Sequence, residues 1–435
     1  MMMENIAQET LDKAIKYADK AEIYLEREEK LEVNVQNQMV DFAKETSSYG
    51  VAVRVIINQK MGFAYTTDLS KIDLTIKNAV YNAKCNLADP NFDFAPYSKY
   101  PNVPDLYDKL IPQMEISDAV EFSKTMIQNS IDEKCQPTSG GTHAGSYETL
   151  ILNSDGAYCQ DLSTYFSAFI SVNIPDGEGV STAHESDTSR FMDLDPEQIS
   201  GEACQVAKNS RGGKSIETAD LNVLMDYDAA ASLIYTLANA FNADNVQRGR
   251  SLYADKMDKQ VLSPNLSIYD DGTLKKGLNS SRSDGEGIPT QKTTLVNKGV
   301  LKNFVHDLYT SKKAETETTG NGIRSSYADM PSVGFTNFIL DFEEQKEISE
   351  IENGVMVKDL LGAHTANPIS GDFSVEAMNA FKIDDGEISN PIRKAMLSGN
   401  IYQAFTESWA ASTKTRQIGS FVLPQIVVSK LRIVG

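Results

Sequence analysis

Residues 21–70 alternate apolar and polar side chains through several short runs rich in Val, Ile, Tyr and Phe. A period of two puts apolar side chains on one face of a sheet and polar ones on the other, whereas a helix repeats at 3.6. We therefore expect a meander of antiparallel strands here, with turns at SSYG (47–50) and NQKMG (58–62). Residues 1–24 and 69–88, on either side, have helical spacing.

This pattern repeats in outline further along the chain. Helical spacing over 116–134 precedes strand-like sequence over 145–174, and a second helix is expected over 195–210. The two sections, 1–108 and 109–220, are predicted as α/β units that either stand apart or pack together as one domain. A duplicated unit is one interpretation, although the two sections share little sequence identity.

The character of the chain changes after a linker that ends at residue 220. Short strands dominate residues 221–435, and Asp-Gly or Asn-x-Gly turns stand at 270–272, 297–299 and 384–386. We expect a β-rich, mostly antiparallel C-terminal domain. The predicted fold class is α+β, with N-terminal helix-plus-strand-meander sections followed by this domain.

Composition excludes several classes of protein. A formal charge of −20 and a pI near 4.7 argue against direct nucleic-acid binding, which needs a clustered basic face. The N-terminus lacks the apolar core of a secretory signal, and no apolar run is long enough for an ordinary membrane span. Dispersed cysteines indicate reduced thiols in a cytoplasm; they are Cys85, Cys135, Cys159 and Cys204.

The four histidines give no clear metal site. His184 opens HESDT, but Thr188 replaces the second histidine of a zinc-protease helix. His143 stands in what is expected to be a Gly-rich loop, and His306 in a predicted strand, NFVHDLY. His364 lies in a predicted loop, where function concentrates, yet an ordinary loop histidine is the favoured interpretation.

The segment 232–249 is predicted to begin with a buried helix. Leu233, Leu237 and Phe241 recur at helical spacing, and Asp226 or Asp228 is a suitable N-cap. No His, Cys, Glu, Lys or Arg occurs between residues 229 and 243. From the residues alone this is a packing helix without chemistry.

Three phrases of the C-terminal domain carry a family resemblance. They are SIYDDGTLKKGLNSSRSDGEGIPTQKTTLVNKGVLKNFVHDLYTSKKAETETTGNGIRSS (267–326), PSVGFTNFIL (331–340) and NPISGDFSVEAMNAFKIDDGEISNPIRKAMLSGN (367–400). Their order and spacing resemble the TldD/TldE (PmbA) family, also described as peptidase family U62 and as modulators of DNA gyrase. The resemblance extends to the three-part layout and covers essentially the whole chain.

The resemblance implies a zinc site in one branch of the family. In TldD a helix carries His-Glu-x-x-x-His, and a cysteine near the C-terminus completes the ligands, which leaves zinc a position for water. The matching positions of this chain are Ile234, Tyr235 and Asn239, or, one residue further on, Tyr235, Thr236 and Ala240. No cysteine follows Cys204. The resemblance therefore implies the TldE/PmbA branch, the non-catalytic partner of TldD.

The resemblance also implies partners. We expect a TldD-like catalytic subunit that holds the zinc, and extended peptides as substrates; the isolated chain could form a homodimer. This chain itself is expected to hold no metal and to carry no catalytic residue. Arg324, Asn337 and Asp372 match phrases that both branches share, and they are predicted to line a residual cleft.

Two other functions remain open from the sequence. The chain could be a stand-alone hydrolase with a different site, around His364 and Asp372. It could also be a regulatory binding protein that acts on DNA gyrase or on a toxin–antitoxin pair, as one of the family names suggests.

Overall fold

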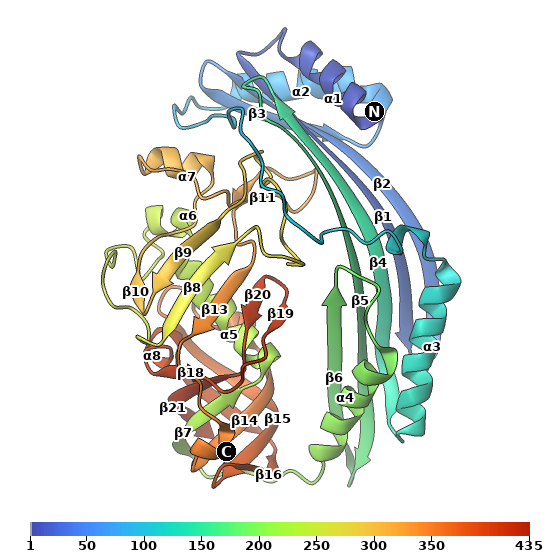
Figure 1. Cartoon of the computed structure of the whole chain (residues 1–435), viewed down its shortest axis with the longest axis vertical. Helices are drawn as coiled ribbons and strands as arrows, with labels where there is room; N and C mark the ends of the chain where they lie inside the picture. The colour runs from blue at the N-terminus through green and yellow to red at the C-terminus, as the bar shows by residue number, and fades with distance from the viewer. Residues whose placement is uncertain (1) are drawn as a thin grey trace.

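The N-terminal half of the chain forms one curved, six-stranded antiparallel sheet in the order β3-β2-β1-β4-β5-β6 (Figure 1). This computed structural model describes residues 2–435. The strands are β1 (Lys20–Gln36), β2 (Met39–Ile57), β3 (Lys60–Thr66), β4 (Gln136–Asn153), β5 (Tyr158–Asp176) and β6 (Gly179–Ser189). Strands from both predicted α/β sections share this sheet, so we propose that the two sections form one domain.

These strands are longer than the sequence indicated. The segment SSYG, predicted as a turn, lies inside β2, where Ser47 pairs with Glu29 and Tyr49 with Arg27 of β1. That turn prediction is wrong because continuous pairing with β1 outweighs the local turn preference of two serines and a glycine. The turn at Asn58 and Gln59 is confirmed, since both residues adopt positive φ between β2 and β3.

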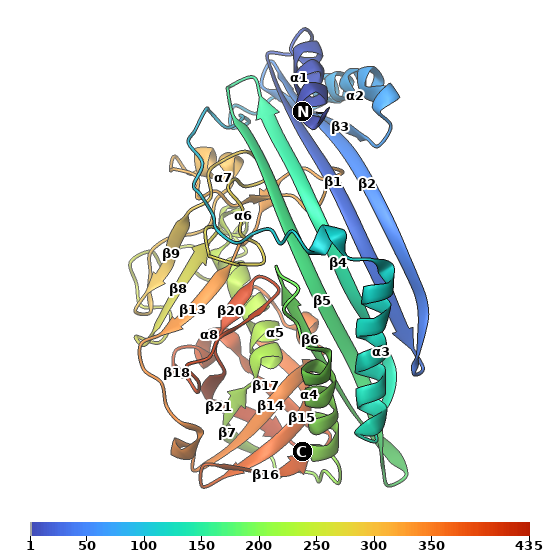
Figure 2. The same ribbon diagram turned by 45° about the vertical axis from the view of Figure 1, so that its right-hand side comes forward.

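Four helices cover a single face of the sheet (Figure 2). They are α1 (Met2–Ala14), α2 (Ile72–Cys85), α3 (Ile116–Asp132) and α4 (Pro196–Asn209). The odd-numbered residues of β1 point toward them: Ile23 packs with α1 and α2, and Val33 packs with α3. The alternation of apolar and polar residues along the strands thus gives the sheet one apolar face, which the helices bury, as the sequence predicts.

The C-terminal domain is built from two main sheets with α5 (Tyr227–Ala238) between them. One sheet holds β7 (Ala219–Met225), β14 (Asn353–Leu361), β15 (Asp372–Asp384), β16 (Glu387–Ile392), β17 (Ala395–Asn400), β18 (Ser408–Ala410) and β21 (Ile426–Val434). The other holds β8 (Leu266–Asp271), β9 (Lys292–Asn297), β10 (Val300–Leu301), β13 (Phe338–Phe342), β19 (Arg416–Ile418) and β20 (Phe421–Leu423). Among the strands named in residues 2–435, only β13–β20 and β14–β7 pair in parallel, so the α+β prediction is confirmed.

Short elements complete this domain. They are α6 (Ala243–Gln247), α7 (Leu308–Lys313), α8 (Ile401–Ala404) and the two-stranded ribbon of β11 (Gly322–Ile323) and β12 (Ser332–Val333). His306, predicted within a strand, instead precedes α7, because Asp307 caps that helix by accepting from the Thr310 amide. Among residues 2–435, no helix is long and apolar enough to cross a membrane.

Candidate functional site

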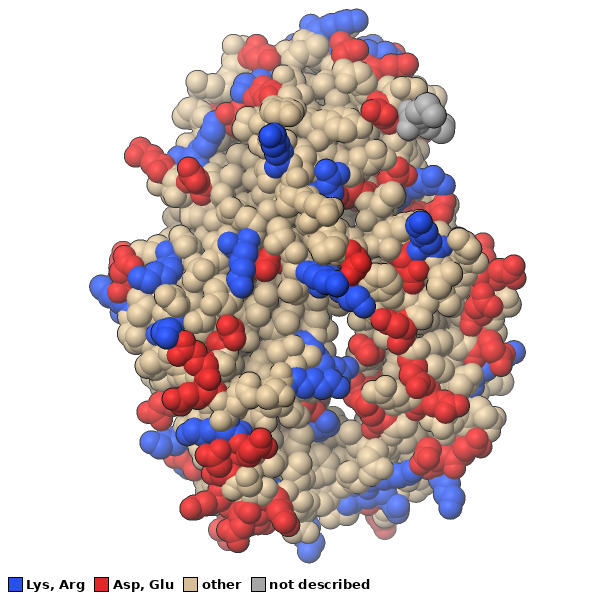
Figure 3. Space-filling view, viewed as in Figure 1, with Lys and Arg blue, Asp and Glu red and all other residues tan. Residues whose placement is uncertain are grey.

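The face of the N-terminal sheet opposite the helices contacts the C-terminal domain at its two ends. At one end, called the upper joint below, Glu22 contacts Arg324. At the other end, the lower joint, His184 Nε2 lies 4.0 Å from Asp359 Oδ2. Between the two joints, the Arg282 amide donates to Asp161 of β5, and Arg190, just after β6, donates to the Gly277 carbonyl. Figure 3 shows an opening through the molecule between the two halves. In that view Lys and Arg side chains lie on the C-terminal-domain rim of the opening, and Asp and Glu on the sheet side. The opening is therefore framed by charges of opposite sign.

Aromatic side chains gather on the middle of this sheet face. The rings of Tyr147 and Tyr165 stack with centroids 5.6 Å apart, and His143 meets Phe169 edge-on at 6.0 Å. Their strand register places them on the same face as Glu22. This face offers stacking surfaces and hydroxyls to whatever enters the opening.

His143 lies in β4 and not in the Gly-rich loop that the sequence predicts. The neighbouring glycine is needed there, since a Cβ at Gly145 would lie 2.6 Å from Cε1 of Tyr165. These glycines make room for rings on the adjacent strand, and they do not form an anion-binding loop. Burial lowers the pKa of His143, and its buried Nε2 has no hydrogen-bond partner among the described residues.

Helix α5 and the 3-10 turn that follows it, Asn239–Phe241, carry the positions at which the family resemblance places zinc ligands. Ile234 and Ala240 are fully buried hydrocarbon, and Thr236 is also buried. Tyr235 is 65% exposed, with its ring edge-on to Phe421. The Asn239 amide donates to the Tyr235 carbonyl at 2.8 Å. The helix is a core element of its domain with one exposed aromatic side chain.

A charged cluster surrounds the start of α5. Asp226, the N-cap residue, accepts from Lys358 and from Gln425 Nε2 instead of from the helix. Arg416 lies over the Tyr227 ring and reaches Glu185 of β6 at 2.9 Å. These contacts fix α5 beside the lower joint between the two halves.

The three predicted cleft residues do not lie together. The Arg324 side chain is buried against Glu22, and its Nε donates to the Gly285 carbonyl at 2.6 Å. Asn337 is fully buried and donates to the Asp271 carbonyl. Asp372 is exposed at the start of β15, where Asn400 and Ser370 donate to it and lower the pKa of its carboxyl. A shared cleft stays a prediction from the sequence.

The remaining histidines are equally dispersed. His184 lies on the exposed side of β6, and His306 is partly buried, with a pKa lowered by burial. His364 occupies a short 3-10 turn, Ala363–Thr365. No group of three His, Cys, Asp or Glu side chains within residues 2–435 is placed to hold a metal ion.

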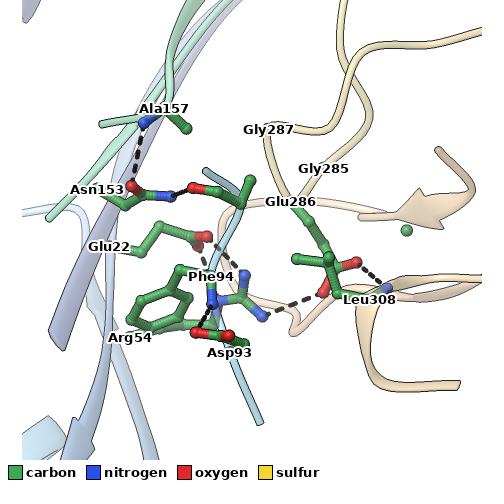
Figure 4. A network of polar contacts seen from close by, with 12 residues as sticks. Glu22, Arg54, Asp93, Phe94, Asn153, Ala157, Gly285, Glu286, Gly287 and Leu308 are labelled. Atoms are coloured by element: carbon green, nitrogen blue, oxygen red, sulfur yellow. Dashed lines mark hydrogen bonds and ion pairs between the residues drawn. The ribbon is translucent and has the colours of Figure 1, made fainter. Parts of the chain in front are cut away.

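Sequence reasoning missed a buried ion-pair network at the upper joint (Figure 4). Arg54 of β2 donates to both oxygens of Glu22, at 2.8 and 2.6 Å, and its guanidinium lies 5.2 Å from the Phe94 ring. Glu286 of the C-terminal domain approaches the same guanidinium at 3.7 Å. Glu22 and Arg54 stand opposite each other on neighbouring strands. Charged residues in a strand usually face solvent, so the sequence does not indicate that these two are buried.

Comparison with known proteins identifies the scaffold as that of a metallopeptidase. Family models match residues 21–83 (PmbA/TldA metallopeptidase domain 1), 109–211 (its central domain) and 218–435 (its C-terminal domain). The chain belongs to the PmbA/TldD family. The resemblance inferred from sequence is thereby confirmed.

Relatives match along almost the whole chain. An uncharacterized Methanocaldococcus jannaschii protein is 36% identical over 96% of this chain and 98% of its own. The structure of TldE from Thermococcus kodakarensis is 25% identical, covers 100% of both chains and superimposes with a TM-score of 0.93. A Thermotoga maritima protein, named as a candidate modulator of a DNA gyrase, shares the fold at 23% identity, with a TM-score of 0.91 over 99% of this chain and 100% of that one.

The family name implies a metal, but the residues of this chain do not fit one. Zinc is held by imidazole, thiolate or carboxylate. The candidate positions on α5 and in the turn after it offer hydrocarbon, a phenol, a hydroxyl and an amide, and the last cysteine of the chain is Cys204 on α4. We therefore assign no metal-dependent step to this chain.

Proposed function

We propose that this protein is the non-catalytic, TldE/PmbA-like subunit of a cytoplasmic zinc metallopeptidase complex that cuts extended peptides. The observation that carries the proposal is the composition of α5 and of the 3-10 turn after it. A catalytic zinc site needs three ligands and a base beside an open coordination position. Here Ile234 and Ala240 are buried in the core. No candidate ligand position holds an acidic side chain or an imidazole.

The opening between the two halves supports a role in handling peptides. Its sheet side carries the Tyr147–Tyr165 stack, and the charges on its rims differ in sign. Aromatic faces bind apolar side chains, and rings with hydroxyls tolerate many sequences because they combine stacking with hydrogen bonding. Such a surface suits a subunit that admits or orients peptides for cleavage by a partner.

Reconstitution tests the proposal. The purified chain and the TldD-like protein of the same organism would be mixed and analysed by size-exclusion chromatography with light scattering, zinc determination and hydrolysis of an unfolded peptide. We expect a stable complex whose zinc belongs to the partner, and peptide cleavage that needs both chains. As a control, a partner with its zinc histidines replaced should assemble without activity.

Two results would contradict the proposal. One is stoichiometric zinc and peptide cleavage by the isolated chain, which would favour a stand-alone hydrolase. The other is failure of the two chains to associate. A homodimer of the isolated chain agrees with the proposal if the TldD-like protein displaces one copy.

A variant of this chain examines the part played by α5. Tyr235→Ala removes the exposed ring, and Tyr81→Ala, on the outer surface of α2 and 68% exposed, is the matched control. We expect Tyr235→Ala alone to lower cleavage by the assembled complex without preventing assembly. Equal activities of the two variants would argue against contact between α5 and the peptide substrate in the assembled complex.

A further inference from the structure

A cavity lies at the upper joint, on the C-terminal-domain side of Arg54. Its volume is about 400 Å³, and its walls come from both halves of the chain. The N-terminal half supplies Arg54, Met61, Phe92 and Asp93, and the C-terminal half supplies Glu286, Asp307 and Tyr309 among others. This volume suits a small organic group, so the identity of that group depends on the wall chemistry.

Glu286 lines this cavity, and Figure 4 shows the contacts of its carboxylate with Arg54 and with the Leu308 amide. The residue is only 4% exposed. Its Oε2 accepts from the Leu308 amide at 2.8 Å, while the nearest cation to Oε1, Arg54 Nη1, lies at 3.7 Å, beyond hydrogen-bond range. Within residues 2–435, Oε1 accepts no hydrogen bond and has only the Arg54 guanidinium near it, so this oxygen is available to a donor that enters the cavity.

Asp307 provides a second such oxygen. This residue is 6% exposed and lines the same cavity. Its Oδ1 accepts from the Thr310 amide at 2.8 Å and from the Thr310 hydroxyl at 2.7 Å. Its Oδ2 accepts no hydrogen bond from the described residues, so only one of the two carboxylate oxygens takes part in capping the helix.

The buried charges around Glu286 do not balance. Four acids, Glu22, Asp284, Glu286 and Asp307, face two arginines, Arg54 and Arg324. Both arginines donate to Glu22, so neither is free to neutralise the other acids fully. Burial and the charge of Asp284 raise the pKa of Glu286. A carboxyl with a raised pKa holds its proton more firmly, and a cation that enters the cavity can replace that proton.

Other charges of the wall are already paired. Asp93 accepts from Lys20 and Lys312, and Asp244 pairs with Arg248 at 2.7 Å. Asn242, Thr310 and Ser332 add polar atoms to the wall. Its apolar and aromatic part includes Met61, Met330, and the rings of Phe92 and Tyr309, which lie 5.3 Å apart. These groups suit a hydrocarbon chain and the flank of an organic cation, whereas a hydrated inorganic ion would leave them uncovered.

We propose that this cavity binds an alkylammonium group, with Glu286 and Asp307 as its counter-ions and the Phe92 and Tyr309 rings beside its hydrocarbon stem. The group can come from a free aliphatic diamine or from a lysine side chain of a peptide. The site lies apart from α5, and it does not depend on the proposed role as a subunit.

Calorimetric titration of the full-length chain tests the proposal. The probes are 1,5-diaminopentane, Nα-acetyl-lysine methylamide, and 1-pentanol as a neutral molecule of similar length. We expect one or both amines to bind and 1-pentanol not to bind; the tighter amine identifies the source. Glu286→Gln should weaken amine binding at least tenfold, and Glu387→Gln, an exposed change on β16, should leave it unchanged.

Proton release gives a second readout. When a proton leaves Glu286 as the ammonium enters, binding tightens with rising pH, and titration in buffers of different ionisation enthalpy reports the released proton. The charged groups facing Glu286 are Arg54 from β2, Asp284 from the same loop and Asp307 before α7. If Glu286→Gln fails to fold, Asp307→Asn, which keeps an oxygen for the N-cap, takes its place.

Three outcomes would overturn the proposal. The first is the absence of binding for both amines. The second is equal affinity of 1-pentanol and the amines, or of Glu286→Gln and the unmodified protein. The third is displacement of the amine by an equal concentration of K⁺, which would show a site for inorganic cations only.

Discussion

Replacing Arg54 by methionine should weaken the joint between the two halves of the molecule. Arg54 is 3% exposed and Glu22 fully buried, and two hydrogen bonds of 2.8 and 2.6 Å connect them. Removing one member of a buried pair typically costs 3–5 kcal/mol because the other charge stays buried. Glu22 retains Arg324, so we place the loss of unfolding free energy at the lower end, about 3 kcal/mol, or about a hundredfold in the unfolding equilibrium.

Urea unfolding measures this loss. Trp409, the single tryptophan, reports on the C-terminal domain, and far-UV circular dichroism reports on the whole chain. Arg27→Met is the matched control, because Arg27 lies on the same sheet with its side chain 50% exposed. A cycle with Glu22→Gln should give non-additive effects, as expected for groups in contact. Surface substitutions usually change the unfolding free energy by no more than about 0.5 kcal/mol. If the unfolding free energies of Arg54→Met and Arg27→Met differ by no more than this, the network does not stabilise the joint.

Three further predictions concern single residues. Gly145→Ala should destabilise the sheet by about 1–3 kcal/mol, as overpacking does, since its Cβ would lie 2.8 Å from the Glu29 carbonyl; thermal unfolding checks this. Gly201→Ala in α4, where the nearest atom is 3.8 Å away, should instead stabilise by about 0.5–1 kcal/mol, and a loss of stability would contradict the helix argument. Burial raises the pKa of Asp270 to about 6 from 3.8, so the folded chain holds a proton there that the unfolded chain has lost. Stability should therefore fall by about 3 kcal/mol as pH rises from about 4 to 6; urea midpoints across this range should show a shallower fall for Asp270→Asn, and equal slopes would refute it.

The fold class was readable from sequence because burial periodicity is local. Alternation along β1 and 3.6-residue spacing along α3 each indicate their own element. The length of β2 was not readable, since its pairing partner decides where it continues. His306 was misassigned because the capping contact between Asp307 and Thr310 outweighed the apolar run around it.

One part of the candidate site could likewise be predicted from the sequence, and another part could not. The absence of ligands on α5 needed only the sequence and the family resemblance. The cavity at Glu286 depends on Arg54, more than 200 positions earlier, and on Asp307, which follows β9 and β10. Neither DGEG nor HDLY indicates burial, so only tertiary structure places these carboxylates together.

The order of the N-terminal sheet also has a consequence during synthesis. On one side β1 pairs with β2, which follows it directly in the chain. On the other side β1 pairs with β4, so Glu22 cannot pair until Asn153 has been synthesised. At about 5–20 residues per second, a ribosome needs about 7–26 seconds to make the intervening segment. Throughout that time the nascent chain presents one bare strand edge. The run EREEK (26–30) lies on it, and dense charge on an edge discourages pairing with a neighbouring nascent chain until β4 emerges.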